Sequence, residues 1–272
     1  MTHGVRNMTE RAVAVLGLDG KKIREVPLPD VFFTAYRPDL IKRAVITSQS
    51  NRLQPKGRNL MAGKRTSAES LGVGYDRSRV PRVKGDRYPR ASAAAFAPST
   101  VKGRVTHPPR AEKKIVKNMN VKERKLAVRS AIAATGAREI VRSRGHIVPE
   151  EATLPLVVVD DIQVVDKAST IRGIMKNIGV WDDVVRVVRS RKMRGGRKRT
   201  RGRGMRRAIG PLIVVSDDGG ISKAARNLPG VQVVNVDSLG AEALAPGTHP
   251  GRLTVWSESA VRMLSTSKGG ST

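Results

Sequence analysis

The sequence predicts an α/β protein: a Rossmann-like layered domain with a mainly parallel sheet, plus a long irregular extended loop inserted in the chain. Two observations predict the domain and its insertion. Short β-branched runs alternate with helical patterns in the C-terminal half, which is typical of a sheet covered by helices on both faces. Residues 54–110, in contrast, have no helical or strand periodicity, and they contain six glycines and six prolines.

The N-terminal residues predict a β-hairpin followed by a helix. The apolar run AVAVLGL (12–18) is followed by Asp19 and Gly20, a pair that favours a tight turn, and then by KKIREVPL (21–28). After Pro38, apolar side chains recur with helical spacing over 39–53. The predicted buried face of that helix contains Leu40, Ile41, Ala44, Val45 and Ser48.

The rest of the layered domain is predicted from a capping signal and an alternation of runs. Asn120, with Glu123 three residues later, predicts the start of a second helix, and Gly136 predicts its end. Five β-branched runs then predict buried strands at 154–159, 184–188, 212–215, 231–236 and 253–256. Helices are predicted at 168–178, 220–228, 238–244 and 257–264. Right-handed crossovers between such strands give a layered domain.

The positive charge is concentrated in two segments. The chain has 52 Lys and Arg against 23 Asp and Glu, a formal net charge of +29. Residues 52–110 hold 14 basic and three acidic residues, and residues 189–207 hold 11 basic residues and no acid. We therefore expect a globular domain over 1–53 and 111–272, an extended basic loop over 54–110, and a basic internal loop over 189–207 between two predicted strands.

Such an excess of charge indicates a polyanionic partner, because self-repulsion destabilises a compact chain. Nucleic acid is the first candidate and an anionic membrane surface the second. No apolar run approaches the ~18 residues of a transmembrane helix, and the first eleven residues lack the apolar core of a secretory signal. The chain has no cysteine, which excludes disulfides and Cys-ligated zinc and fits a reducing cytosol.

The composition of residues 54–110 admits two interpretations. A connection this long without structure of its own is far outside the usual loop length, which favours a disordered insertion. Its charges, however, are spaced by small residues and prolines, and Tyr75, Tyr88 and Phe96 are interleaved with them. That pattern suits an arm that folds along a phosphate backbone, with Gly and Ala permitting close approach and Arg bonding to phosphates. Irregular arms suit folded RNA better than DNA.

Two acidic pairs are the candidates for catalysis. Asp160 and Asp161 follow one predicted strand, and Asp217 and Asp218 follow another. Ligands often bind at the carboxyl ends of parallel strands, so these carboxylates could hold magnesium in a nucleic-acid enzyme. The alternative is that they cap the following helix or turn. The four histidines form no ligand pair, and the sequence predicts neither a metal nor a cofactor.

Seven motifs in order along residues 12–264 identify a resemblance. They are AGKRTSAESLGVG (62–74), RVPRVKG (79–85), RVTHPPR (104–110), KERKLAVRSAIAAT (122–135), LPLVVVDD (154–161), KAARNLPGV (223–231) and PGRLTVWSESA (250–260). Together they resemble the family of the fourth protein of the large ribosomal subunit, in its archaeal and eukaryotic branch. The resemblance implies a non-enzymatic, cytoplasmic ribosomal protein that binds large-subunit ribosomal RNA and acts early in subunit assembly.

The resemblance also implies a role for the inserted loop. Its tip, at about 72–90, would line the polypeptide exit tunnel beside the twenty-second large-subunit protein and contact the nascent polypeptide. The implied tunnel-lining residues are Gly74, Tyr75, Arg77, Arg79 and Arg82. Within the loop, charge and the matched motifs predict RNA contacts by Arg52, Lys56, Arg58, Lys64, Arg65, Arg77, Arg79, Arg82, Lys84, Arg87, Arg90, Lys102, Arg104, His107 and Arg110. Charge alone predicts further contacts by Arg191, Lys192, Arg194, Arg197, Lys198, Arg199, Arg201, Arg203, Arg206 and Arg207.

Overall fold

The computed structural model describes residues 12–150 and 152–266, which form two compact units. The first unit contains the described residues up to Gln49 and from Lys117 onward, and the second is Ser50–Val116. The first eleven and the last six residues, which belong to the predicted globular domain, lie outside the described residues. Within the described ranges, no helix is long and apolar enough to cross a membrane.

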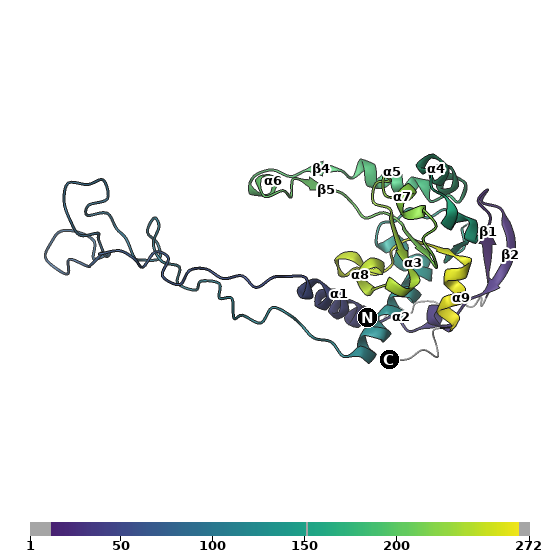
Figure 1. Cartoon of the computed structure of the whole chain (residues 1–272), viewed down its shortest axis with the longest axis horizontal. Coiled ribbons are helices and arrows are strands. Elements are labelled where there is room, and N and C mark those ends of the chain that lie inside the picture. The colour runs from purple at the N-terminus through teal and green to yellow at the C-terminus, as the bar shows by residue number, and fades with distance from the viewer. Residues whose placement is uncertain (1–11, 151, 267–272) are drawn as a thin grey trace. The chain divides into compact units, whose positions relative to one another are not determined.

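A six-stranded sheet forms the centre of the first unit, in the order β2-β1-β3-β8-β6-β7 (Figure 1). Its strands are β1 (Ala12–Leu16), β2 (Lys22–Pro27), β3 (Leu156–Val158), β6 (Leu212–Val215), β7 (Gln232–Asn235) and β8 (Thr254–Ser257). Only β1 and β2 pair antiparallel, and the other four pairings are parallel. The prediction of a mainly parallel α/β sheet is therefore confirmed, whereas the label Rossmann-like stays a prediction.

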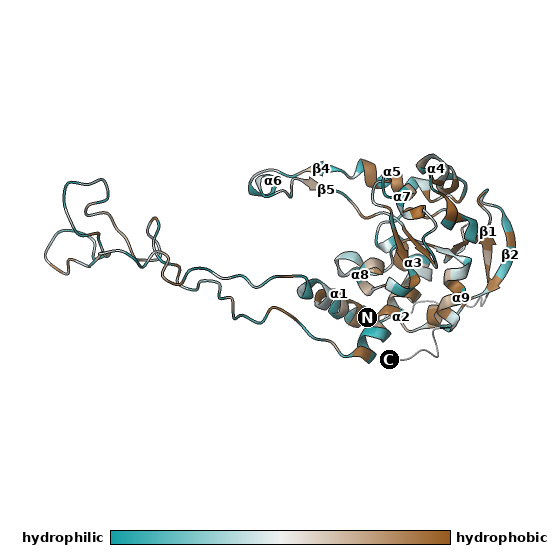
Figure 2. Ribbon diagram, in the orientation of Figure 1, coloured by the Kyte–Doolittle hydropathy of each residue, from teal (hydrophilic) through white to brown (hydrophobic). Residues whose placement is uncertain are grey.

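Helices pack on both faces of this sheet, because successive strand residues point to opposite sides. The helices are α1 (Pro38–Asn51), α2 (Val121–Gly136), α3 (Arg138–Ser143), α4 (Ala168–Asn177), α5 (Trp181–Arg189), α7 (Ile221–Ala225), α8 (Ala241–Leu244) and α9 (Glu258–Thr266). Val157 of β3 packs in one apolar core with residues of α1, α2, α8 and α9. Its neighbours Leu156 and Val158 pack in a second core with residues of α3, α4, α5 and α7. Figure 2 shows the hydrophobic colour along the central strands of the sheet, whereas β2 at its edge is largely hydrophilic.

The hairpin turn between β1 and β2 depends on Gly20. Its φ is +80°, the left-handed region that the predicted Asp-Gly turn requires. A Cβ at this position would lie 2.3 Å from the carbonyl oxygen of Asn177, at the end of α4. The side chain of Asn177 donates a hydrogen bond to the carbonyl of Leu18, with a distance of 3.1 Å. The turn is therefore held against α4, and the predicted hairpin is confirmed.

The predicted strand at 184–188 is wrong, because these residues belong to α5. Val184 and Val187 are buried and three residues apart, whereas Val188 is 51% exposed, so the valines follow a helical period. Two aspartates in the first turn and arginines in the last turn also suit the dipole of a helix. The basic segment 189–207 consequently follows a helix instead of connecting two strands.

The second predicted helix is confirmed in its bounds but not in its cap. It begins at Val121 and ends at Gly136, as the sequence indicated. Asn120 takes the N-cap position, yet its side chain makes no capping hydrogen bond. Buried alanines and small residues, among them Ala127 and Ala131, let α2 pack closely in the first core. Packing of this face, and not the capping box, therefore accounts for the helix.

Candidate nucleic-acid interface

The second unit, Ser50–Val116, is an extended chain that folds back on itself without a core. Of its residues, all of which the structure describes, only Ser50 and Ala95 are buried. Beyond the last residues of α1 it has isolated antiparallel bridges, in which Glu69 and Arg82 exchange backbone hydrogen bonds of 3.0 and 2.9 Å. Its shape is therefore defined mainly by local backbone hydrogen bonds and not by apolar burial.

Close approach of two backbone segments requires glycine in this unit. Gly63 has a φ of +80°, and a Cβ there would lie 2.5 Å from the carbonyl carbon of Gly103. A Cβ on Gly103 would lie 2.0 Å from the carbonyl oxygen of Ala97. Any other residue at these two positions would force the segments apart.

Arg82, Lys84 and Arg104, three of the predicted RNA-binding cations, have partners within this unit, and Arg52 is not free either. Arg82 donates a hydrogen bond from Nη1 to the carbonyl of Ser92, at 3.0 Å. Lys84 pairs with Glu69 at 2.5 Å, with both side chains more than half exposed. The guanidinium of Arg104 lies 5.8 Å from the ring centre of Phe96. Arg82, which was also assigned to the tunnel lining, therefore stabilises the unit's own fold.

Most of the other predicted cations are exposed and unpaired. Among the described residues, the structure places no side-chain partner or carboxylate against Lys56, Arg58, Lys64, Arg65, Arg77, Arg79, Arg87, Arg90, Lys102 and Arg110. The predicted tip is also exposed: Gly72 and Gly74 have positive φ angles, and Tyr75 is 63% exposed. His107 is exposed as well. Unpaired cations on an extended backbone are suited to bind a polyanion.

The second basic segment, in the first unit, is an ordered hairpin. Strands β4 (Lys192–Met193) and β5 (Met205–Arg206) pair antiparallel. The segment that connects them contains α6 (Arg197–Thr200), at the end of the hairpin (Figure 1). Most of its basic side chains are exposed, among them Arg191, Arg197, Lys198, Arg199, Arg201 and Arg203, and Arg194 is partly buried. The basic internal loop is therefore a hairpin with fixed backbone pairing, which we call the basic hairpin.

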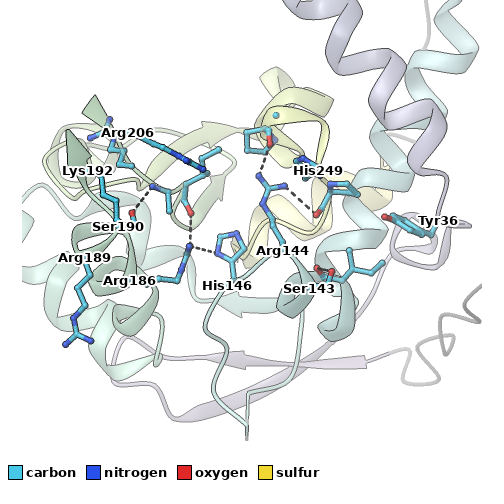
Figure 3. Close-up of a pocket in the computed structure, with 17 residues that line it drawn as sticks. Tyr36, Ser143, Arg144, His146, Arg186, Arg189, Ser190, Lys192, Arg206 and His249 are labelled. Carbon is cyan, nitrogen blue, oxygen red and sulfur yellow. Dashed lines mark hydrogen bonds between the residues drawn. The ribbon is translucent and has the colours of Figure 1, made fainter. Parts of the chain in front are cut away.

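A pocket of about 1060 Å³ lies at the base of the basic hairpin (Figure 3). It is lined by residues of α3, α5, the hairpin and the segment 246–250. The residues that line the pocket include no Asp or Glu. Six of them are cationic: Arg144, Arg186, Arg189, Lys192, Arg206 and Arg207. We call this the basic pocket. It brings together Lys192, Arg206 and Arg207, which the sequence predicted, with Arg144, Arg186 and Arg189, which it did not.

Backbone carbonyls hold Arg144 at the pocket. Its Nη2 donates a 2.8 Å hydrogen bond to Pro246, and its Nη1 lies 3.5 Å from the carbonyl oxygen of Pro250. Burial, and secondly the charge of Arg186, lowers the pKa of Arg144 to about 10. The side chain nevertheless keeps its charge at neutral pH, and no described residue supplies a carboxylate partner.

A buried carboxylate positions the neighbouring Arg186. Asp183 is fully buried and accepts hydrogen bonds from Arg186 Nε (2.8 Å) and His146 Nδ1 (2.9 Å). Burial by itself would raise the pKa of Asp183, but the hydrogen bonds from His146 and Arg186 outweigh it and lower that pKa. Because an ionised carboxylate only accepts, Nδ1 of His146 carries the proton. Arg186 also donates to the carbonyl of Ile209 at 2.8 Å.

One aspartate of each acidic pair, Asp160 and Asp218, serves the fold, whereas Asp161 and Asp217 are exposed. Asp160 accepts hydrogen bonds from the backbone N–H and the hydroxyl of Ser259, at 2.8 and 2.7 Å. Asp218 accepts from the backbone N–H groups of Gly220 and Ser222 at the start of α7, and hydrogen bonds from Ser222 lower its pKa. Of the described residues, no group of three His, Cys, Asp or Glu could hold a metal ion. The capping interpretation thus accounts for Asp218.

Comparisons with known proteins agree with the resemblance. The model of the "Ribosomal protein L4/L1 family" matches residues 26–267. A protein of Methanosphaera stadtmanae named "Large ribosomal subunit protein uL4" is 48% identical over 252 residues, covering 93% of this chain and 95% of that one. The protein of the same name from Saccharolobus islandicus is 45% identical over 258 residues, covering 94% and 95%. This family is structural and not enzymatic, so the alternative of a magnesium-dependent enzyme is wrong. The chain belongs to the ribosomal protein L4/L1 family.

Proposed function

We propose that this structural constituent of the large ribosomal subunit binds large-subunit ribosomal RNA through Ser50–Val116 and the basic hairpin. The observation that supports this most directly is the set of ten exposed, unpaired cations in a unit without a core. Each can contact a phosphate and release counterions, which gives affinity that depends strongly on salt. Binding of separate RNA segments by the unit and the hairpin would support early assembly of the subunit in the cytoplasm.

The tip of the second unit is proposed to line the polypeptide exit tunnel. Exposed Tyr75, Arg77 and Arg79 project from a backbone that bends at Gly72 and Gly74. Arg82 supports this segment from within, through its hydrogen bond to Ser92. By its resemblance to the family, we place the tip beside the twenty-second large-subunit protein and in contact with the nascent polypeptide.

Sedimentation tests the first part of this proposal. The tagged full chain is expected to migrate through a sucrose gradient with the large subunit and its RNA. Co-migration is expected to fall as salt rises, because phosphate contacts release counterions. Recovery with chromatin, or migration apart from the large subunit at low salt, would show that the chain has another partner.

Crosslinking tests the tunnel assignment. The chain has no cysteine, so a single introduced cysteine is a unique attachment site. A photoactivatable crosslinker on Tyr75→Cys is expected to capture a stalled nascent polypeptide in purified ribosomes. The matched control is Ser169→Cys, on an exposed position of α4. Equal capture from both positions, or none from Tyr75→Cys, would place the nascent chain away from the tip.

A further inference from the structure

The basic pocket has features of a site that is built in advance for an anion. Hydrogen bonds to the protein hold two of its arginines in place. Arg144 donates to the carbonyl of Pro246, and Arg186 donates to the carbonyl of Ile209 and to the buried Asp183. Figure 3 shows Arg144, Arg186, Lys192 and Arg206 around the same cavity. Fixed donors lose little conformational entropy when a ligand binds. The pocket therefore differs from an array of mobile surface lysines.

The charge in the pocket is not compensated by the described protein. Among residues 12–150 and 152–266, the only carboxylate in hydrogen-bond contact with a lining cation is that of Asp183, which is fully buried and does not line the pocket. No described residue pairs Arg144, Arg189, Lys192, Arg206 or Arg207 with an acid. Like charges this close repel one another, so an entering anion would relieve the repulsion. Guanidinium groups are strong donors to phosphate oxygens, and Nη1 of Arg186 is left for an anion because Nε and Nη2 donate to Asp183 and Ile209.

The size of the pocket indicates more than a single phosphate group. Its volume of about 1060 Å³ is just above the roughly 300–1,000 Å³ range of small-molecule pockets. Tyr36 and His249, labelled in Figure 3, add aromatic surface to the lining, and Pro250 also lines the pocket. A chain with several phosphates and exposed bases or sugars fits both kinds of surface. The basic hairpin continues from the same pocket and supplies Lys192 and Arg206 as paired neighbours.

We propose that the basic pocket binds a turned segment of RNA backbone through at least two successive phosphates. This site is separate from Ser50–Val116, and its assignment to RNA rests on the proposed function. Arg144 and Arg186 hold the phosphate that enters deepest, because their donors are fixed. Lys192 and Arg206 bind the next phosphate at the mouth. The protein thereby fixes the path of one RNA segment on its folded domain.

The test uses a local reporter on the full chain. Ser143 lines the pocket and is exposed, so an environment-sensitive dye on Ser143→Cys reports on ligand in the pocket. The probe is a single-stranded RNA of eight uridines, titrated at several salt concentrations. The dye signal is expected to change and to saturate. The same dye on Ser169→Cys, outside the pocket, is expected to change much less.

Two matched double variants separate the pocket from general charge. Lys192→Gln with Arg206→Gln removes two cations at the pocket, and Lys125→Gln with Arg124→Gln removes one Lys and one Arg at exposed positions of α2, outside the pocket and the hairpin. We expect the pocket pair to weaken RNA binding on the order of tenfold and to lower the salt slope by about 1.4, since a single strand contributes about 0.7 per phosphate contact. The second pair is expected to change little both the RNA affinity measured with the dye on Ser143→Cys and its salt slope. Equal losses in both, or no signal from Ser143→Cys, would overturn the proposal.

Competitors identify the class of ligand. Tripolyphosphate is expected to displace the RNA, and polyglutamate of equal charge is expected to displace it much less. Polyglutamate binding as tightly as RNA would indicate an acidic protein segment instead, and binding of tripolyphosphate without binding of RNA would indicate a small anion. Either result overturns this inference. If the chain still migrates with the large subunit, the proposed function stands, so the two failures are distinguishable.

Discussion

Trp256 in the first unit is fully buried, with its ring edge-on to Phe32 at 5.5 Å, whereas Ser50 and Ala95 are the only buried residues of Ser50–Val116. The first unit can bury apolar side chains on both faces of its sheet. The second has isolated aromatics and many exposed cations. Hydrophobic burial is the main favourable contribution to folding, so the two parts of this chain cannot be stabilised in the same way.

The comparison separates what the protein provides from what a partner must provide. Ordering a residue costs about 1–2 kcal/mol of backbone entropy, which the second unit cannot offset with apolar burial. Its ion pair between Lys84 and Glu69 is exposed and contributes little. We therefore propose that phosphates of the RNA stabilise this unit by neutralising its cations, and that it becomes ordered on binding.

The largest expected effect is on the stability of the first unit. Trp256→Ala is expected to lower the free energy of unfolding by about 3–5 kcal/mol, because it leaves a cavity in a closely packed core. Urea denaturation of the free chain measures this loss. Phe96→Ala, in the second unit, is the matched control and is expected to change stability by less than about 0.5 kcal/mol. Similar losses from both would indicate that the second unit has a core of its own.

The next effect concerns binding and leaves stability unchanged. Changing Arg58, Arg77, Arg79 and Arg90 together to Gln removes four exposed, unpaired cations. We expect the salt slope of binding to large-subunit RNA to fall by up to about four, with the urea midpoint unaltered. Filter binding at several salt concentrations measures the slope.

A control with the same loss of charge makes that result specific. Four exposed lysines of the first unit serve for it: Lys42, Lys122, Lys125 and Lys176. Their change to Gln is expected to reduce the slope much less. If both sets lower it equally, net charge and not the position of the second unit determines affinity.

The smallest expected effect is a pH dependence that belongs to the first unit. Burial lowers the pKa of His146; hydrogen bonding to Asp183 opposes this shift, and the charges of Arg186 and Arg144 add to it. The unfolded chain therefore binds a proton near pH 6.5, the ordinary pKa of histidine, while the folded chain does not until the pH is lower. The contribution of His146 to the free energy of unfolding is therefore expected to be fully present above about pH 6.5 and to fall as the pH drops below that value.

His146→Asn tests this assignment. The Asn side-chain amide can donate to Asp183 in place of Nδ1 but does not titrate. Urea midpoints measured between about pH 5 and pH 7.5 are expected to vary less in this variant than in the original chain. An unchanged pH profile would show that other groups cause the dependence.

Local chemistry made much of the fold predictable. The Asp19–Gly20 pair has the turn geometry that it indicated, and the runs that became β3, β6, β7 and β8 were recognised as strands. The predicted burial is correct for β3, β6 and β8, whereas β7 is only partly buried. The run 184–188 was predicted as a strand but belongs to α5, because five mostly β-branched residues are too short to distinguish a strand from a helix. The helical period becomes visible only in the folded chain, where Val184 and Val187 are buried and Val188 is exposed.

That error also concealed part of the basic pocket. Arg186 and Arg189 are three residues apart and share one side of α5 as a helix. Arg144 is distant in sequence, and only the fold brings it to the same cavity. Its basic surroundings, RSRGH at 142–146, were the only local signal. The exposed cations of Ser50–Val116 needed no such contacts to be found, since their charge and spacing are visible in the sequence.

Amide hydrogen exchange tests most directly whether RNA orders the second unit. The measurement compares residues 60–100 in the free chain and in the purified large subunit, with β6 and β8 of the first unit as the internal reference. We expect the amides of 60–100 to exchange rapidly in the free chain and to be protected in the subunit, while the reference strands are protected in both. Full protection of 60–100 in the free chain would contradict this account.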